Sequence, residues 1–406
     1  MALIVQKYGG SSVADAGKIK NVARRITSTR DKGNQVVVVV SAMGDTTDEL
    51  LELANQISER PDNRELDALV STGEIVSATL LTMALHDMGC KAISLTGAQA
   101  GIRTTSVYRQ ARIIEVESKR VVKELEKGSI VIVAGFQGVT EDMDVTTLGR
   151  GASDTSAVAL AASLEAKVCE RYTDVDGIYT ADPRMVPEAR PLSEISYDEM
   201  LELATYGSKA MHPRAIELAG LYDMPILVAS SFNDSPGTLI HGGTSMEVRN
   251  KVSSVAHDLD VAKITVVGVP DRPGIAAVIF ESLAAADVSV DTIVQNSSIG
   301  NITDLTFTVT KGQLPKALEV VKPICESIGA KDCISDSRLG KVSIIGAGMQ
   351  NAPGYAGRMF QTLSENGINI QMIATSEIRI TCIIDEAKVK DAVRALHRAF
   401  ELDKDE

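Results

Sequence analysis

The chain has few of the residues from which metal sites, disulfide frameworks and nucleic-acid surfaces are built. Its five cysteines form no Cys-x-x-Cys pair, and its five histidines do not cluster with them. We therefore expect no zinc site and a reducing compartment, the cytosol. No block of lysine or arginine forms a basic stripe, and the formal net charge is -13, so we expect no nucleic-acid partner.

Long apolar runs are also missing. The first run, residues 2–5, is too short for the apolar part of a signal sequence, and no later run approaches the ~20 residues that a membrane-spanning helix requires. We therefore expect a soluble, unprocessed protein without a membrane contact. With 406 residues, 44% of them apolar, the chain can bury more than one core, and its length suggests about two to four domains.

Three apolar runs are each followed directly by small residues or glycine. They are 35–40 (QVVVVV), 91–95 (KAISL) and 129–134 (SIVIVA), and residues 16–30 before them have a helical period. Continuous apolar strands that alternate with helices are typical of a parallel sheet covered on both faces. Ligands bind such a sheet at the carboxyl ends of its strands, so we predict an α/β fold whose loops converge on one crevice.

The loop Lys7-Tyr8-Gly9-Gly10-Ser11-Ser12 follows the N-terminal apolar run and precedes the first helix. Glycines in such a turn let backbone N–H groups approach an anion, and the helix N-terminus adds the positive end of its dipole. Lys7 adds a mobile positive charge, so the combination suits a polyphosphate. The alternative is a tight strand-to-helix turn with a lysine that reaches solvent.

Residues 149–156 (GRGASDTS) form a second polar loop before an alanine-rich helix over 157–164. Arg150 offers a bidentate fork for a carboxylate. Asp154 or Ser153 could instead simply cap the helix.

Glu74 stands at the head of a mostly apolar helix. It could be a partner of the helix dipole in the first turn. A substrate that carries both an ammonium group and carboxylates would, however, need one glutamate and one arginine that face each other, and Glu74 and Arg150 suit this pair.

Residues 172–184 (YTDVDGIYTADPR) form the densest motif and have no amphipathic period. A Thr-Asp pair at a strand end, a glycine turn, a tyrosine that can pack on a ring and an Asp-Pro-Arg turn predict a nucleotide pocket with an arginine directed at phosphate. A structural cluster of turns is the alternative. Residues 206–213 (YGSKAMHP) add Lys209 before a helix that starts with proline.

Six motifs in this order resemble those of aspartate kinases, which have the amino acid kinase fold. They are KYGGSS from Lys7, SAMGDTTDEL from Ser41, STGE ending at Glu74, TLGRGASDTSAVALA from Thr147, TDVDGIYTADPR from Thr173 and YGSKAMHPRA from Tyr206. One departure is visible, because the family has Gly-Gly where this chain has Gly151-Ala152. The resemblance implies a mainly parallel sheet between helix layers over residues 1–245.

The last third of the chain contains a repeat. Residues 263–268 (KITVVG), Pro273-Gly274, Phe280 and Leu283 recur as 341–346 (KVSIIG), Pro353-Gly354, Phe360 and Leu363. Each copy predicts a strand, a Pro-Gly loop, a helix and two more strands, at 288–291 and 305–309 in the first copy and at 368–371 and 378–384 in the second.

This order resembles the ferredoxin-like ACT domain, a small-molecule-binding module that aspartate kinases carry in tandem. We place the two copies at 261–335 and 340–406. A repeat that serves only packing is the alternative, and Gly346-x-Gly348 lacks the third glycine of a dinucleotide motif.

The resemblance implies transfer of the γ-phosphoryl group of ATP to the β-carboxylate of L-aspartate, which gives 4-phospho-L-aspartate, the first step of lysine, threonine and methionine biosynthesis. The acceptor carboxylate is ionised at pH 7, so catalysis reduces to positioning and charge neutralisation. By this resemblance Lys7 and Asp154 are catalytic, with Lys7 stabilising the γ-phosphoryl group and Asp154 holding Lys7 in place. Aspartate is held by Thr47, Glu74, Arg150 and Ser153. ATP is held by Lys7, Gly9, Gly10, Ser41, Thr173, Asp174, Tyr179, Arg184 and Lys209. We expect Mg²⁺ to arrive bound to ATP, because the sequence shows no dedicated carboxylate cage.

The resemblance also implies feedback inhibition, with lysine and threonine acting together through the ACT domains. A ligand carboxylate would bind the free N–H groups at the helix start after each Pro-Gly pair. The expected effector residues are Asp271, Gly274, Ile275, Ala276, Gln295, Asn296, Asn351, Pro353, Asn369, Ile370, Thr375, Ser376 and Glu377. We also expect a homodimer or higher oligomer paired through ACT sheets, and a regulatory fragment that starts near Met246.

Rival functions make different demands on the sequence. N-acetylglutamate and uridylate kinases share the fold, but the tandem repeat argues against both. A catalytically silent amino-acid sensor would lose the Lys7, Arg150 and Asp154 set, which is present. A bifunctional kinase with a dehydrogenase would need another large domain with a complete dinucleotide motif.

Overall fold

The computed structural model describes residues 2–149, 151–208, 210–243, 252–296, 298, 300–349 and 353–404. The chain forms two compact units. The first unit comprises Met1–Tyr179, Pro191–Thr205 and Lys209–Met246, and the second comprises Thr180–Arg190, Tyr206–Ser208 and Glu247–Glu406.

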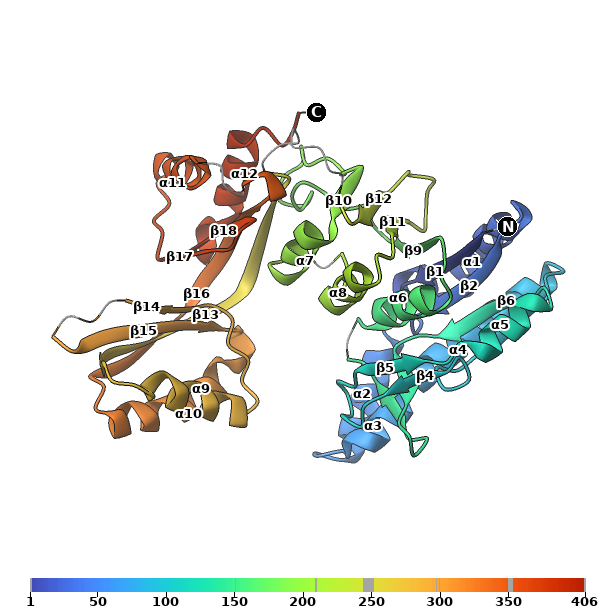
Figure 1. The fold of residues 1–406 in the computed structure, drawn as a ribbon, viewed down its shortest axis with the longest axis horizontal. Coiled ribbons are helices and arrows are strands. Elements are labelled where there is room, and N and C mark those ends of the chain that lie inside the picture. Colours follow the sequence, from blue (N-terminus) through green and yellow to red (C-terminus); the bar gives the residue numbers. More distant parts are fainter. Residues whose placement is uncertain are drawn as a thin grey trace. The chain divides into compact units, whose positions relative to one another are not determined.

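The first unit is built on an eight-stranded sheet in the order β10-β12-β11-β9-β1-β2-β6-β3 (Figure 1). All neighbouring strands are parallel except β11 and β12. A separate four-stranded sheet has the order β5-β4-β7-β8. The strands are β1 (Leu3–Tyr8), β2 (Gln35–Val40), β3 (Ala92–Leu95), β4 (Ile102–Thr104), β5 (Ile113–Val116), β6 (Ile130–Ala134), β7 (Gln137–Val139), β8 (Val145–Thr147), β9 (Val168–Thr173), β10 (Glu194–Ser196), β11 (Ile226–Ser230) and β12 (Thr238–His241).

Helices cover both faces of the large sheet, as the continuous apolar strands predict. The helices of the first unit are α1 (Ala16–Asp31), α2 (Thr46–Ile57), α3 (Asn63–Val70), α4 (Thr72–Asp87), α5 (Lys119–Glu126), α6 (Ser153–Ser163), α7 (Tyr197–Thr205) and α8 (Pro213–Leu221), of which α3 packs against β8 of the small sheet. Alternate residues of β2, Val36, Val38 and Val40, pack with α1 and α4 in one core cluster. The intervening Val39 faces the side of α6, since a Cβ at Gly135 would lie 2.9 Å from Val39 Cγ1 and 3.0 Å from Ser153 Cβ.

One helical stretch, Asn63–Asp87, is long and apolar enough in composition to cross a membrane. This corrects our expectation that no stretch approaches that length. The stretch consists of α3 and α4, and 56% of its most apolar window is buried. Ala78, Leu81 and Leu85 of α4 pack against the large sheet, so packing explains why these positions are apolar.

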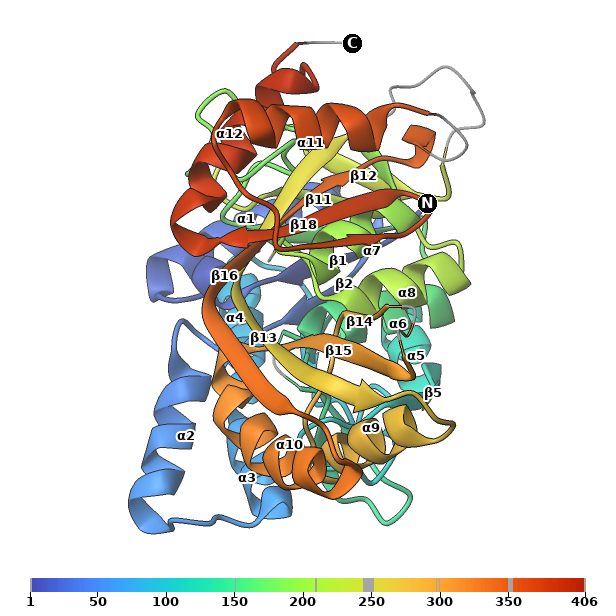
Figure 2. The ribbon, with the colours of Figure 1, turned by 90° about the vertical axis from the view of Figure 1, so that its left-hand side faces the viewer.

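The second unit is built on a six-stranded antiparallel sheet in the order β14-β15-β13-β16-β18-β17. Its strands are β13 (Ser254–Pro270), β14 (Ile293–Gln295), β15 (Ile302–Val309), β16 (Asp332–Ile345), β17 (Met372–Thr375) and β18 (Arg379–Asp385). Its helices are α9 (Ile275–Ala285), α10 (Leu314–Ile328), α11 (Tyr355–Glu365) and α12 (Val389–Ala399). Figure 2 shows the long strands β13 and β16 running side by side through both repeats.

The repeat found in the sequence is a structural repeat. Both Pro-Gly loops end in a glycine at the helix N-cap, with φ of 95° at Gly274 and 106° at Gly354. The strands expected at 288–291 and 368–371 are wrong, because β14 and β17 begin later. The N–H groups of Val288 and Ile368 instead close the preceding helices by donating to the carbonyls of Leu283 and Leu363.

Candidate active site

Lys7 lies within β1, which continues to Tyr8, and its side chain is buried rather than directed into solvent. Its Nζ lies 2.6 Å from Asp154 Oδ1. Burial lowers the pKa of Lys7, and the negative charge of Asp154 opposes that shift. The buried ion pair therefore argues against the simple turn that the sequence left open.

Asp154 occupies the first turn of α6. The N-cap of that helix is Ala152, and no side chain caps it, so neither Asp154 nor Ser153 serves as the N-cap. Burial alone would raise the pKa of Asp154, but Arg171 and Lys7 outweigh it and hold that pKa at about 2. Asp154 is thus an ionised carboxylate between two cations.

The loops after β1, β2 and β9 meet at the carboxyl ends of these strands. The Ser41 N–H donates to the Tyr8 carbonyl (3.1 Å), and the Gly9 N–H donates to the Tyr172 carbonyl (3.4 Å). A Cβ at Gly10 would lie 2.7 Å from the carbonyl oxygen of Ala42, so this close approach requires glycine. The arrangement brings Gly9, Gly10 and Ser41 to the same edge of the sheet as Lys7.

Glu74 is buried in the first turn of α4, against the loop that follows β2. Its Oε1 accepts a hydrogen bond from the Ala42 N–H at 3.1 Å, whereas its Oε2 is buried and has no partner among the described residues. Burial raises the pKa of Glu74 to about 7, although the hydrogen bond from Ala42 lowers it. An unpartnered carboxylate oxygen of this kind can accept a hydrogen bond from a cationic ligand.

The structure gives only the positions of the other residues expected to bind aspartate. Ser153 is buried beside Gly135 at the start of α6, and Thr47 lies in the first turn of α2. Arg150 lies outside the described residues. The structure therefore places Ser153 next to Asp154 at the start of α6 and leaves Arg150 a prediction.

The expected ATP residues divide between the two units. Thr173, at the end of β9, donates through its hydroxyl to Asp174 Oδ1 (3.0 Å), and Tyr179 pairs with Pro191 in an isolated bridge. Arg184 is exposed in the stretch Thr180–Arg190, which folds with the second unit. Lys209 lies outside the described residues.

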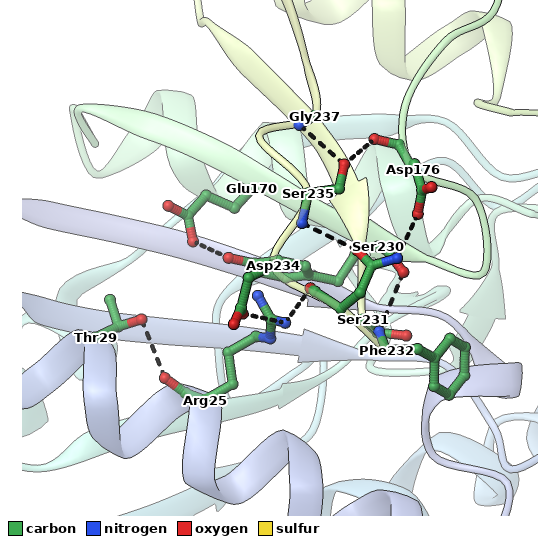
Figure 3. A network of polar contacts seen from close by, with 12 residues as sticks. Arg25, Thr29, Glu170, Asp176, Ser230, Ser231, Phe232, Asp234, Ser235 and Gly237 are labelled. Atoms are coloured by element: carbon green, nitrogen blue, oxygen red, sulfur yellow. Dashed lines mark hydrogen bonds and ion pairs between the residues drawn. The ribbon is translucent and has the colours of Figure 1, made fainter. Parts of the chain in front are cut away.

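The loop after β11 adds polar residues that the sequence analysis missed (Figure 3). Asn233 donates through its side chain to Asp176 Oδ1 (2.7 Å), and Ser235 donates to the Asp176 carbonyl (2.9 Å). Arg25 of α1 donates to the Asn233 carbonyl (2.7 Å). These bonds fix the strand-end loops of β9 and β11 to each other, and the motif SSFNDSPG at 230–237 was the available signal.

Arg171 was also missed. It lies beside Lys7 in the parallel register of β9 and β1, and its Nε donates to Asp154 Oδ2 at 3.1 Å. The available signal in the sequence was an arginine just before the predicted strand end at Thr173-Asp174, where a charge that becomes buried requires a partner.

The expected effector residues lie at the two edges of the six-stranded sheet. Gln295 ends β14 and Thr375 ends β17, and these strands are opposite edges. The first loop follows Pro270, which pairs with Ile302, whereas the second loop follows Ile345, which pairs with Arg379. The expected effector residues of the first repeat and those of the second repeat therefore do not form one site within the sheet of a single chain.

Most of the remaining expected effector residues lie next to these strands and loops. Exposed positions are Asp271, Gly274, Ala276, Asn296, Pro353, Asn369, Ser376 and Glu377, whereas Ile275 is buried and Ile370 is half-buried. Asn351 lies outside the described residues. Within the described ranges no group of three or more His, Cys, Asp or Glu side chains is arranged to hold a metal ion.

Comparisons with known proteins agree with this architecture. The amino acid kinase family matches residues 2–230, and the ACT domain matches residues 264–323 and 342–400. The aspartokinase of Mycolicibacterium smegmatis is 51% identical over 411 residues, which cover 100% of this chain and 98% of that protein. The structure of E. coli aspartokinase III with aspartate and ADP (R-state) is similar with a TM-score of 0.79 at 25% identity, covering 98% of this chain and 99% of that one. The same enzyme with lysine and aspartate (T-state) gives a TM-score of 0.77 at 25% identity, with the same coverage.

Proposed function

Because this chain belongs to the aspartokinase family, we propose that it transfers the γ-phosphoryl group of ATP to the β-carboxylate of L-aspartate. The products are 4-phospho-L-aspartate and ADP. The observation that carries the proposal is the buried pair of Lys7 and Asp154 at the carboxyl end of the parallel sheet, at 2.6 Å.

The buried charges suit this reaction. The acceptor carboxylate is already ionised, so the protein needs to supply orientation and positive charge rather than a general base. Lys7 stabilises the negative charge on the transferring phosphoryl group, and Asp154 holds the ammonium of Lys7 in place. The free Oε2 of Glu74 accepts a hydrogen bond from the ammonium of aspartate, and Arg150 binds its α-carboxylate.

ATP binds along the ends of β1, β9 and β11. Gly9, Gly10 and Ser41 lie against its phosphates, on loops that the Gly9 and Ser41 N–H groups hold to the neighbouring strands. Thr173 and Asp174 line the same site. Tyr179, Arg184 and Lys209 complete the site. Mg²⁺ arrives with the nucleotide and neutralises phosphate charge.

The domain boundaries that we propose are 1–245 for the catalytic domain and 261–335 and 340–406 for the ACT domains. Lysine and threonine inhibit the enzyme by binding at the Pro-Gly loops. Support comes from the lysine complex of the E. coli enzyme and from the glycine N-caps at Gly274 and Gly354. Because the two expected sets lie at opposite sheet edges, complete effector sites require pairing of ACT sheets between two chains. A homodimer in the cytoplasm and a regulatory fragment that starts near Met246 complete the proposal.

Trapping of the acyl phosphate with hydroxylamine tests the function directly. With Mg-ATP the purified chain should release ADP only when L-aspartate is present and should form aspartyl hydroxamate, whereas N-acetyl-L-glutamate and UMP should give neither signal. The Lys7→Met variant should lose both products, and Lys20→Met, which removes an exposed lysine of α1, should keep them. ADP release that is indifferent to aspartate, or that follows one of the other acceptors, would contradict the proposal.

A further inference from the structure

Arg171 and Lys7 are two cations side by side in a buried part of the first unit. They are register partners in the parallel strands β9 and β1, so their side chains project from the same face of the sheet, about 5 Å apart at the backbone. Their side chains are 11% and 7% exposed. Two like charges at this depth repel each other strongly unless an anion lies between them.

Asp154 is that anion, and it binds one cation with each oxygen. Lys7 Nζ lies 2.6 Å from Oδ1, and Arg171 Nε lies 3.1 Å from Oδ2. Asp154 is itself 4% exposed. Two cations and one carboxylate leave the cluster with one positive charge in excess.

The acid next to Arg171 in the sequence cannot serve it. Successive side chains of a strand point to opposite faces, so Glu170 and Tyr172 face α1. There Glu170 accepts hydrogen bonds from Tyr172 (3.0 Å) and from Gln6 (2.8 Å). Arg171 is thus separated from Glu170 by the sheet and depends on Asp154.

Part of the Arg171 guanidinium remains without a partner. Its Nη1 is buried and makes no hydrogen bond to the described residues. A buried donor without a partner is costly, and a second anion in the site would satisfy it. The cluster is therefore arranged for a ligand that brings negative charge.

We propose that Arg171 is a positioning residue of the phosphoryl site: it occupies Oδ2 of Asp154 and so leaves one uncompensated positive charge at Lys7 for the transferring phosphoryl group. Without Arg171, Asp154 would neutralise Lys7, and the cluster would present no net positive charge to the phosphoryl group. This inference rests on the proposed kinase function.

The cluster also affects how Lys7 titrates. Burial lowers the pKa of Lys7, the charge of Asp154 raises it, and the charge of Arg171 lowers it. Cys169 on β9 also raises the pKa of Lys7, and the charge of Asp154 raises the pKa of His212, before α8, against the effect of burial. Removal of Arg171 should therefore raise the pKa of Lys7, and the loss of activity at high pH should move to higher pH.

The test compares Arg171→Gln, which keeps a donor for Asp154 but removes the charge, with Arg171→Lys, which keeps the charge. For Arg171→Gln we expect turnover to fall about tenfold to a hundredfold with little change in the KM for aspartate. The pH at which kcat falls off on the alkaline side should move up by about one unit. Arg171→Lys should keep most of the wild-type turnover, and its kcat should fall off at the same alkaline pH as that of the wild type. Lys167→Gln, which removes an exposed charge just before β9, is the matched control and should change neither.

A readout without catalysis separates this inference from the proposed function. The pH dependence of Lys7 labelling by an amine reagent, followed by mass spectrometry, gives the pKa of Lys7 even if the chain phosphorylates no aspartate. The inference is overturned if Arg171→Gln keeps turnover within about twofold of the wild type and its Lys7 labels with the same pH dependence. If Arg171→Gln does not fold, Arg171→Lys decides, because a tenfold loss of turnover in that charge-preserving variant would contradict a role through charge. If the wild-type chain shows no aspartate-dependent ADP release, the proposed function is overturned. The labelling experiment would still show whether Arg171 lowers the pKa of Lys7.

Discussion

Replacement of Glu74 by glutamine should make the protein more stable at pH 8 while it weakens aspartate binding. The Glu74 carboxyl is buried, with one hydrogen bond from Ala42 and one oxygen without a partner among the described residues. Folding therefore has to bury a carboxylate that, in the described part of the chain, has no cationic side chain beside it to offset its charge. Such a residue is costly to the fold and useful to the site.

The magnitude follows from its pKa. Burial raises the pKa of Glu74 from 4.5 to about 7, which is about 2.5 units or ~3 kcal/mol. The folded state favours the protonated form of Glu74, so burial of Glu74 does not lower the free energy of unfolding below about pH 4.5. Stability is then lost as the pH rises toward 7, and the full cost is present above it. Glutamine does not titrate, so the Glu74→Gln variant should escape this loss.

The assay is urea unfolding followed by circular dichroism at pH 5 and at pH 8. We expect the gain of Glu74→Gln over the wild type to be larger at pH 8 than at pH 5 by about 2 to 3 kcal/mol. Glu52→Gln, at an exposed position of α2, should show no such difference. In kinetics, Glu74→Gln should raise the KM for aspartate far more than that for ATP. A stability difference that is the same at both pH values, or an unchanged KM for aspartate, would refute the reasoning.

Three further outcomes test other parts of the site. Lys7→Ala should lower kcat at least ~10²-fold with little change in ATP affinity measured by calorimetry, and more than a tenth of wild-type turnover would make Lys7 a structural lysine. Arg150→Ala should raise the KM for aspartate and Arg184→Ala that for ATP, and equal effects on both substrates would contradict the assignment. Gln295→Ala and Thr375→Ala should keep turnover but lose most inhibition by lysine plus threonine in the ADP-release assay; unchanged inhibition would place the effectors elsewhere.

Much of the fold could be predicted from the sequence because its strands are locally unambiguous. The run at 35–40 is β2, and the helical period at 16–30 becomes α1. The parallel sheet follows from strands that are apolar on both faces. What the sequence could not show is how far β13 and β16 extend, because neither strand has a regular period. Residues 339–345 of β16 are buried, whereas residues 332–338 are exposed or half-buried, and β16 pairs with β13 over both parts.

The candidate site could be predicted only where a motif carries it. The pairing of Lys7 with Asp154 was expected, but the partner of Asp154's second oxygen was not, because Arg171 meets it only through the register of β9 with β1. The raised pKa of Glu74 likewise depends on the loop that covers it. Long-range register and burial decide both features, and neither is a property of a local pattern.

The stretch Thr180–Arg190 shows how tertiary packing can reassign a motif. The residues that flank it belong to the first unit, where the Leu192 N–H donates to the Ile178 carbonyl (2.7 Å). Its tip folds with the second unit: Ala181 and Val186 lie in the core cluster that contains residues of α11 and α12.

Polar contacts hold the same tip. Thr180 Oγ1 lies 2.9 Å from His397 Nε2, and Arg394 Nε donates to the Met185 carbonyl at 2.7 Å. Turn residues dominate this stretch in the sequence, and two small apolar side chains among them give no sign of a distant core. The stretch that carries Arg184 therefore folds with the ACT core, whereas Tyr179, its neighbour in the chain, folds with the first unit, and the boundary between the two units falls inside a motif that the sequence presents as one.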